Sequence, residues 1–191
     1  IEETGMSTVS IICTVRNGEH FISETIESII QQTYRDWEMI IVDDGSNDDT
    51  KKIIEFYQKK DSRIKVIQTE GIGRGKCLNL ALNNCRGKYV GNIDADDPSH
   101  PQRLEIELKF LESHDYALIC TESLKIWDDS KPIWREYKIE NINIIDVTKS
   151  LVFYNPVCHS SVLIRKDVLN KVGNYDDNRV SQFDYELWVR L

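Results

Sequence analysis

The sequence has few cysteines, and none of them stands in a metal-binding or redox spacing. There are five, an odd number, and no two are separated by only two residues. Most lie inside apolar segments, so we expect reduced thiols buried in a core rather than a disulfide framework. Reduced thiols are typical of a cytoplasmic protein, and that is the predicted location. The five are Cys13, Cys77, Cys85, Cys120 and Cys158.

Positive charge is also in short supply. The 24 Lys and Arg residues are outnumbered by 32 Asp and Glu residues, which gives a formal net charge of -8. A nucleic-acid surface needs a basic stripe to neutralise phosphates, and none is visible, so we expect no nucleic-acid partner. An anionic ligand would need a cation to mediate its binding.

Long apolar runs are missing as well. No uninterrupted stretch approaches the roughly 20 residues of a membrane span, and no signal-peptide pattern opens the sequence. The composition suits one domain with a full core, expected over residues 8–191 behind a short tail at 1–7. The last residues, 185–191, read as part of an amphipathic helix, which predicts that the domain is truncated at this end.

The chain alternates short β-branched runs with segments of helical spacing. Four runs are expected as strands, and each is followed by apolar residues three or four positions apart. Repeated strand–helix units with short connections predict a doubly wound, mostly parallel α/β sheet with right-handed crossovers. The predicted strands are 9–15, 38–42, 64–67 and 88–93.

Two acidic runs stand at the carboxyl ends of predicted strands, where open α/β sheets bind their ligands. These are Asp43-Asp44 and the D-x-D segment Asp94 to Asp97. Like charges about 4 Å apart repel by about 4 kcal/mol at an effective dielectric near 20, and a divalent ion, or a hydrogen-bond donor from a ligand, would offset this repulsion. The pattern favours Mg or Mn held by few carboxylates and substrate phosphates. The simpler alternative is an acidic turn that caps the helix expected near Pro101.

Four ordered segments together resemble the family 2 glycosyltransferases of GT-A fold, of the bacterial surface-polysaccharide type. The resemblance implies a Rossmann-like sheet with a small mixed sheet on the acceptor side. It also implies a nucleotide-binding part at 8–127 and an acceptor part at 128–191. The four segments are Val9 to Gly18, Ile41 to Ser46, Asp94 to Asp97 with Pro101 and Arg103-Leu104 behind it, and Asp184 to Trp188.

The resemblance implies a nucleotide site built from several strand ends. Thr14 and Arg16, at the end of the first strand, match residues that wrap a uracil ring. Asp44 matches a carboxylate that accepts a hydrogen bond from the base, with Asp43 forming the turn beside it. A basic pair in the glycine-rich segment 71–76 matches cations near the diphosphate, although a solvated basic loop is an equal alternative. The implied nucleotide-binding residues are Thr14, Arg16, Asp43, Asp44, Arg74, Lys76 and Asp94.

The same resemblance implies the reacting groups. Asp96 matches the direct metal ligand, while Asp94 matches a group that reaches the ribose or a metal-bound water. Asp184 matches the base that takes the proton from the acceptor hydroxyl, but Phe183 precedes it where the family usually has an acidic residue. His159 matches a histidine near the donor, with a structural role as an equal alternative.

The implied activity is metal-dependent, inverting transfer of a sugar from a UDP-sugar to an acceptor hydroxyl, with Mg or Mn as cofactor. The acceptor would be a carbohydrate or lipid-linked molecule in polysaccharide or glycolipid synthesis, with a cytoplasmic location, peripheral to the inner face of a membrane. Two alternatives remain, a nucleotide-sugar-binding module without turnover and a sugar nucleotidyltransferase. On the acceptor side the sequence predicts strands at 120–127 and 131–137 and a short helix at 147–153.

Overall fold

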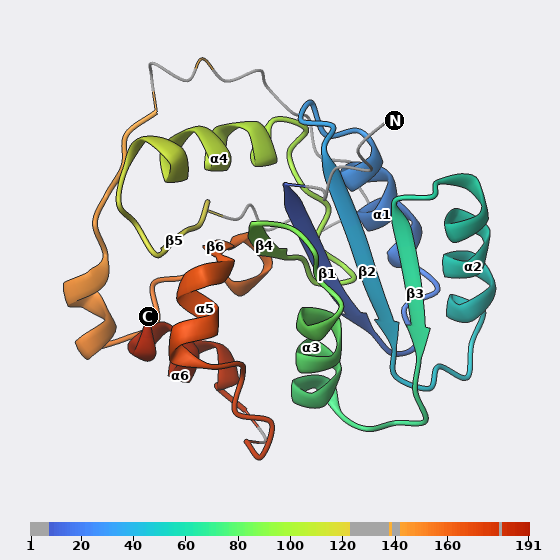
Figure 1. Cartoon of the computed structure of the whole chain (residues 1–191). Helices are drawn as coiled ribbons and strands as arrows, with labels where there is room; N and C mark the ends of the chain where they lie inside the picture. The colour runs from blue at the N-terminus through green and yellow to red at the C-terminus, as the bar shows by residue number, and fades with distance from the viewer. Residues whose placement is uncertain (1–7, 123–137, 139–141, 180) are drawn as a thin grey trace, which may run out of the picture.

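One mixed sheet organises the computed structural model, which describes residues 8–122, 138, 142–179 and 181–191 (Figure 1). Its strand order is β3-β2-β1-β4-β6-β5. The first four strands are parallel, whereas β6 runs antiparallel to both β4 and β5. The strands are β1 Val9–Val15, β2 Trp37–Asp43, β3 Ile64–Gln68, β4 Tyr89–Asn92, β5 Leu118–Ile119 and β6 Leu163–Arg165.

Helices cover both faces of this sheet. Three of them, α1, α2 and α4, pack with one core cluster, and α3, α5 and α6 pack with the other. Two 3-10 turns, η2 Thr148–Val152 and η3 His159–Ser161, precede β6. The helices are α1 Ile22–Ile30, α2 Thr50–Lys60, α3 Arg74–Asn83, α4 Arg103–Ser113, α5 Lys166–Val172 and α6 Phe183–Arg190.

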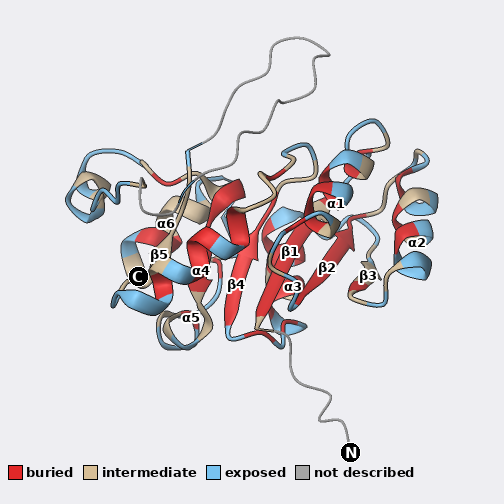
Figure 2. Ribbon diagram, turned by 90° about the horizontal axis from the view of Figure 1, so that it is seen from above, coloured by how far each residue is buried: buried red, intermediate tan, exposed pale blue. Residues whose placement is uncertain are grey.

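The two core clusters follow from the period of two in an extended chain. In β1, Ile11 and Cys13 belong to the cluster under α1, α2 and α4, while Ile12 belongs to the one under α3. Every residue of β2 is buried, as expected for a strand covered on both faces. Figure 2 shows this buried centre between helices whose outer sides are exposed.

The strand order creates a reversal point between β1 and β4. From β1 the chain builds outward to β2 and β3, and then returns to place β4 on the other side of β1. Loops that leave the carboxyl ends of two such strands diverge, and the crevice between them is the usual ligand site of a doubly wound sheet. Both predicted acidic runs lie at this edge, because Asp43 ends β2 and Asp94 follows β4.

The doubly wound, mostly parallel sheet predicted from the sequence is confirmed. The mixed part expected on the acceptor side is the β4-β6-β5 end of the same sheet. The predicted short helix at 147–153 is the 3-10 turn η2. Of the two other predicted strands, 131–137 and most of 120–127 lie outside the described residues, and residues 120–122 are not in a strand.

The described cysteines are all free thiols. Cys13, Cys77 and Cys85 are buried, as predicted for core thiols, whereas Cys120 and Cys158 are only partly covered. Burial raises the pKa of both Cys77 and Cys85 to about 12, so neither is a ready nucleophile. Among the helices of the described residues, none has the length and apolarity to cross a membrane.

Candidate functional site

The D-x-D segment forms a turn directly after β4. The Asp94 amide donates to Ser160 Oγ of η3 at 3.0 Å, and the Asp97 amide donates to the Asp94 carbonyl at 3.2 Å. These two bonds attach the turn to η3 and close it on itself. Asp96 is exposed and forms no hydrogen bond or ion pair within the described part of the chain.

Arg74 pairs with Asp94. It is the first residue of α3, and its Nη2 lies 2.5 Å from Asp94 Oδ1. Asn92 Nδ2 donates to the same oxygen at 3.2 Å. The ion pair is partly solvated, with 45% and 27% of the two side chains exposed. Arg74, which is predicted to lie near the diphosphate, therefore lies beside the D-x-D turn.

Asp44 is buried and holds the segment that leads to Arg74. Its Oδ1 accepts from the Thr69 hydroxyl at 2.6 Å and the Ile72 amide at 2.7 Å, and its Oδ2 accepts from the Gly73 amide at 2.9 Å. Burial on its own would raise the pKa of Asp44, but these hydrogen bonds outweigh burial and lower it. Gly73 has φ +94, a conformation that an L side chain rarely adopts, so glycine suits this turn.

Other predicted nucleotide-binding residues surround the same segment. Asp43 Oδ1 accepts from the Ser46 amide at 3.1 Å and the Ser46 hydroxyl at 2.5 Å, which makes Asp43 the turn former at the end of β2. Arg16 is exposed, and a Cβ added to Gly71 would lie 3.8 Å from its Nη1. Thr14 is partly buried near the end of β1. Lys76 is exposed in the first turn of α3.

Asp184 lies in the first turn of α6, next to Phe183. The Phe183 ring centroid is 5.8 Å from the Arg74 guanidinium carbon, so the start of α6 lies close to the cation that pairs with Asp94. Asp184 Oδ2 accepts a hydrogen bond from Asn155 Nδ2 at 3.1 Å. Arg74 thus links the D-x-D turn to the α6 end that carries the predicted base.

His159 is held between two polar side chains. Its Nε2 lies 2.9 Å from Tyr175 Oη and its Nδ1 lies 3.4 Å from Asn92 Nδ2. Burial lowers the pKa of His159 below its ordinary 6.5, and the positive charge of Arg74 lowers it as well. The negative charges of Asp94 and Asp184 act in the opposite direction and raise this pKa, but burial outweighs them. With both ring nitrogens engaged by Tyr175 and Asn92, the ring is part of the frame around the site.

Behind the turn, Arg103 forms a buried network that ties together β4, η3 and Val162, the residue before β6. Its Nη2 donates to the carbonyls of Asn92 and Val162 at 3.0 Å each, and its Nη1 donates to the Ser160 carbonyl at 3.1 Å. Its Nε lies 3.1 Å from Glu107 Oε1. Burial raises the pKa of Glu107 to about 7, and the Arg103 charge opposes this rise.

The carboxylates of the D-x-D turn suit a divalent cation that receives most of its ligands from a bound nucleotide and water. No group of three or more His, Cys, Asp or Glu residues within the described ranges is arranged as a complete metal cage. Mg and Mn bound with a nucleotide need only one or two carboxylates, and the diphosphate and waters supply the other ligands. Asp96, exposed and unpaired among the described residues, fits that role, and Asp94 lies two positions away.

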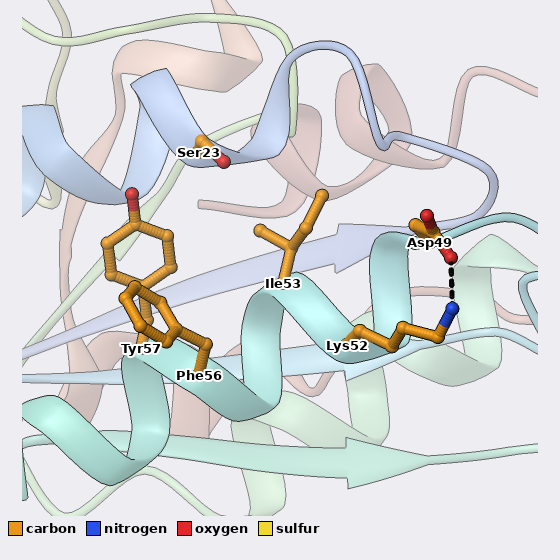
Figure 3. A pocket seen from close by; sticks show the side chains of 6 residues that line it. All are labelled: Ser23, Asp49, Lys52, Ile53, Phe56 and Tyr57. Carbon is orange, nitrogen blue, oxygen red and sulfur yellow. Dashed lines mark hydrogen bonds and ion pairs between the residues drawn. The ribbon is translucent and has the colours of Figure 1, made fainter.

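A surface hollow lies elsewhere, between α1 and α2 (Figure 3). It has a volume of about 400 Å³ and includes none of the predicted site residues. Its one charged contact is an ion pair between Lys52 Nζ and Asp49 Oδ1 at 2.6 Å. The hollow is an open surface groove with mostly apolar walls, and it has no group suited to sugar transfer.

Sequence reasoning located the carboxylates but missed the neutral residues that hold them. Asn92, Asn155 and Tyr175 had no pattern that marked them as site residues. The dipeptide Asn155-Pro156 signals a turn, but nothing in the sequence connects that turn to Asp184. Arg103 and Glu107 are four apart on a helix, a spacing that predicts an ion pair but not its burial.

Comparison with known proteins identifies the family. A family model described as Glycosyl transferase family 2 matches residues 10–173. An uncharacterized glycosyltransferase of Methanocaldococcus jannaschii is 34% identical over 182 residues, covering 94% of this chain and 62% of that protein. The O-antigen biosynthesis glycosyltransferase WbnJ of Escherichia coli is 30% identical over 184 residues, covering 96% of this chain and 71% of that protein. The chain thus spans less than two thirds of the length of the Methanocaldococcus relative.

Solved structures share the fold. TarS of S. aureus, residues 1–349, superposes with a TM-score of 0.75 at 24% identity, over 96% of this chain and 54% of that one. TarS structures with UDP and with UDP-GlcNAc have TM-scores of 0.73 and 0.74. The mannosyltransferase PcManGT of Pyrobaculum calidifontis, in complex with GDP-Man and Mn2+, gives 0.67 at 20% identity, over 92% of this chain and 49% of that one. The sheet with its rim of carboxylates is therefore a GT-A fold, and the chain belongs to glycosyl transferase family 2.

Proposed function

We propose that this protein is a metal-dependent, inverting glycosyltransferase that moves a sugar from a UDP-sugar to an acceptor hydroxyl. The observation that carries the proposal is the position of Arg74. It pairs with Asp94 at 2.5 Å and lies 5.8 Å from the Phe183 ring, next to Asp184. The Arg74 guanidinium therefore lies next to both the predicted donor side and the predicted acceptor side of the site.

The donor would lie along the segment that Asp44 organises. Amides and side chains of residues 69–73 converge on the Asp44 carboxylate, and Arg16 lies at the same segment. By the resemblance, we propose that the nucleotide base would lie near Asp44 and the diphosphate near Arg74 and Lys76. A UDP donor is supported by the TarS complexes with UDP and UDP-GlcNAc, which come from a protein of the same fold.

Transfer with inversion needs a base on the acceptor side. The acceptor oxygen attacks the anomeric carbon, its proton passes to Asp184, and the bond between that carbon and the diphosphate oxygen breaks. Arg74 stabilises the negative charge that develops on the departing nucleoside diphosphate. A Mg or Mn ion bound by Asp96, with Asp94 beside it, would supply further charge stabilisation.

The acceptor is proposed to be a carbohydrate or a lipid-linked saccharide. The support comes from relatives, one of which is named an O-antigen biosynthesis glycosyltransferase. A cytoplasmic location at the inner face of a membrane remains part of this proposal. The division into a nucleotide-binding part at 8–127 and an acceptor part at 128–191 is likewise proposed, with Ser160 joining the two at Asp94.

The test is to incubate the protein with Mn2+ and a panel of UDP-sugars, measure UDP release, and titrate UDP by calorimetry with and without Mn2+. We expect UDP to bind with Mn2+ and to bind more weakly after EDTA. Asp96→Asn should lose the Mn2+-dependent part of binding, whereas the exposed Asp115→Asn should not. No UDP binding under any of these conditions would overturn the proposal.

The same assays separate the alternatives. A binding module would take up UDP with Mn2+ but release none from any UDP-sugar. A nucleotidyltransferase would use UTP and a sugar phosphate as substrates, and it would release pyrophosphate instead of UDP. Proton NMR of the transferred sugar reports whether the anomeric configuration is inverted.

A further inference from the structure

Two consecutive residues of α6 anchor a segment from another part of the chain. Tyr185 Oη donates to the Leu151 carbonyl at 2.5 Å, and Asp184 Oδ2 accepts from Asn155 Nδ2 at 3.1 Å. Segment 151–155 is thus attached to α6 at both of its ends. The residues between the anchors, 152–154, are exposed.

The orientation of the Asn155 amide is set by its own turn. Asn155 Oδ1 accepts from the Val157 amide at 3.1 Å, which forms an Asx turn. Pro156 follows, and its ring restricts the backbone at both positions. With the oxygen end used locally, only the NH2 end remains for Asp184. A reversed amide would place NH2 against an N–H and oxygen against a carboxylate.

This bond occupies one of the two oxygens of Asp184. Among the described residues nothing bonds to Oδ1, so this atom is left to accept a proton. The bond is also exposed, and an exposed hydrogen bond adds little to folding because water replaces it. The hydrogen bond between Asn155 and Asp184 therefore adds little to the stability of the fold, but it holds the proposed base. This combination points to a functional role for Asn155.

We propose that Asn155 is a positioning residue for Asp184: it holds Oδ2 and leaves Oδ1 to take the acceptor proton. This inference rests on the proposed function, in which Asp184 is the base. A misplacement of a reacting group by about 1 Å can cost about 100-fold in rate. Because Asn155 acts through Asp184, its removal should lower kcat and leave donor binding unchanged.

The variants are compared in the full chain with Mn2+ and UDP-GlcNAc or the UDP-sugar that gives the highest turnover. Asn155→Ala should lower kcat for UDP release by about 10- to 100-fold, with the UDP Kd within about twofold and Tm within about 2 °C. Asn155→Asp keeps an oxygen for the Asx turn but loses the donor and adds a like charge, so it should be no better than alanine. Asn84→Ala, an exposed asparagine at the far end of α3, is the matched control and should be unchanged.

A double-mutant cycle decides between a positioning role and a general structural role. Asp184→Asn alone should lower kcat by about 100-fold or more. Adding Asn155→Ala to Asp184→Asn should cause no further loss, because the group it positions is gone. A further loss equal to that of Asn155→Ala alone, or full activity of Asn155→Asp, would overturn the inference.

Failure of the inference and failure of the proposed function give different results. If Asp184→Asn keeps normal turnover, then Asp184 is not the base and the proposed function is wrong in that part. If Asp184→Asn is inactive while Asn155→Ala is fully active, the base stands and only the positioning role is lost. A fall in UDP affinity in Asn155→Ala would place the residue on the donor side and would also contradict the inference.

Discussion

Asp44 Oδ2 accepts a hydrogen bond at 2.9 Å from the backbone amide of Gly73, the residue immediately before Arg74. A carboxylate at the end of one strand therefore fixes the start of α3, and α3 in turn delivers the cation that pairs with the carboxylate after β4. The like-charge repulsion expected between the two acidic runs is offset by the protein's own donors. Ligand binding would rearrange this set of contacts rather than create it.

Removal of the Arg74 guanidinium should weaken nucleotide binding. Arg74→Ala leaves Asp94 without its 2.5 Å partner and removes the positive charge proposed for the diphosphate. We expect a loss of about 1–3 kcal/mol, or roughly 5- to 150-fold in the Kd of UDP with Mn2+, by calorimetry. Arg74→Lys should recover part of it. Lys171→Ala removes an exposed lysine from an ion pair on α5 and should leave the Kd unchanged.

Asp44→Asn should loosen segment 69–73. The NH2 group of asparagine would face amides that now donate to the carboxylate, so we expect about 1–3 kcal/mol of lost stability and weaker UDP binding. Urea unfolding and calorimetry measure the two effects. Equal stability and equal Kd in Asp44→Asn would show that the carboxylate does not organise this segment.

The Asp44 contribution should depend on pH with a defined sign. Its hydrogen bonds lower the pKa of Asp44 below the 3.8 of an unstructured Asp, so the unfolded state binds more protons in acid. The stabilisation should be complete above about pH 5 and fall as pH drops through the lowered pKa. The difference in unfolding free energy between wild type and Asp44→Asn should shrink in acid. A difference that grows in acid would contradict the assignment.

Arg103→Leu should be among the most damaging single substitutions. It leaves Glu107 buried without its partner and removes the donor from the carbonyls of Asn92, Ser160 and Val162. We expect a loss of about 3–5 kcal/mol in urea unfolding. The double variant Arg103→Leu with Glu107→Leu should recover only the part of the lost stability that comes from the unpaired buried charge of Glu107. The rest should stay lost, because the three carbonyls still lack their donor. A double variant less stable than the single one would contradict this.

Tyr175→Phe tests the frame around His159. The substitution leaves Nε2 buried without the hydroxyl that lies 2.9 Å away, which should cost about 1–3 kcal/mol of stability. If His159 has a framing role, the affinity for Mn2+ with UDP should change little. A large fall in that affinity with unchanged stability would instead place His159 among the groups that meet the donor.

The sequence by itself determined the framework of this protein. Short β-branched runs specify the strands, and apolar residues three or four positions apart specify the helices. The order of those elements leads to a parallel sheet because short right-handed crossovers allow few other arrangements. Asp43 ends one buried strand and Asp94 follows another, so both must lie at the carboxyl edge of the sheet. The segment matches to family 2 glycosyltransferases add the family, which the family model confirms.

Only the tertiary structure decided which side chains hold the carboxylates. Arg74 and Asp94 are 20 positions apart, and Asn155 and Asp184 are 29 apart. Such contacts depend on where loops return after each crossover, and loops have no periodic pattern from which that return can be calculated. The neutral partners are also ordinary polar residues, and Asn155 becomes significant only when folding brings the Asp184 carboxylate next to it.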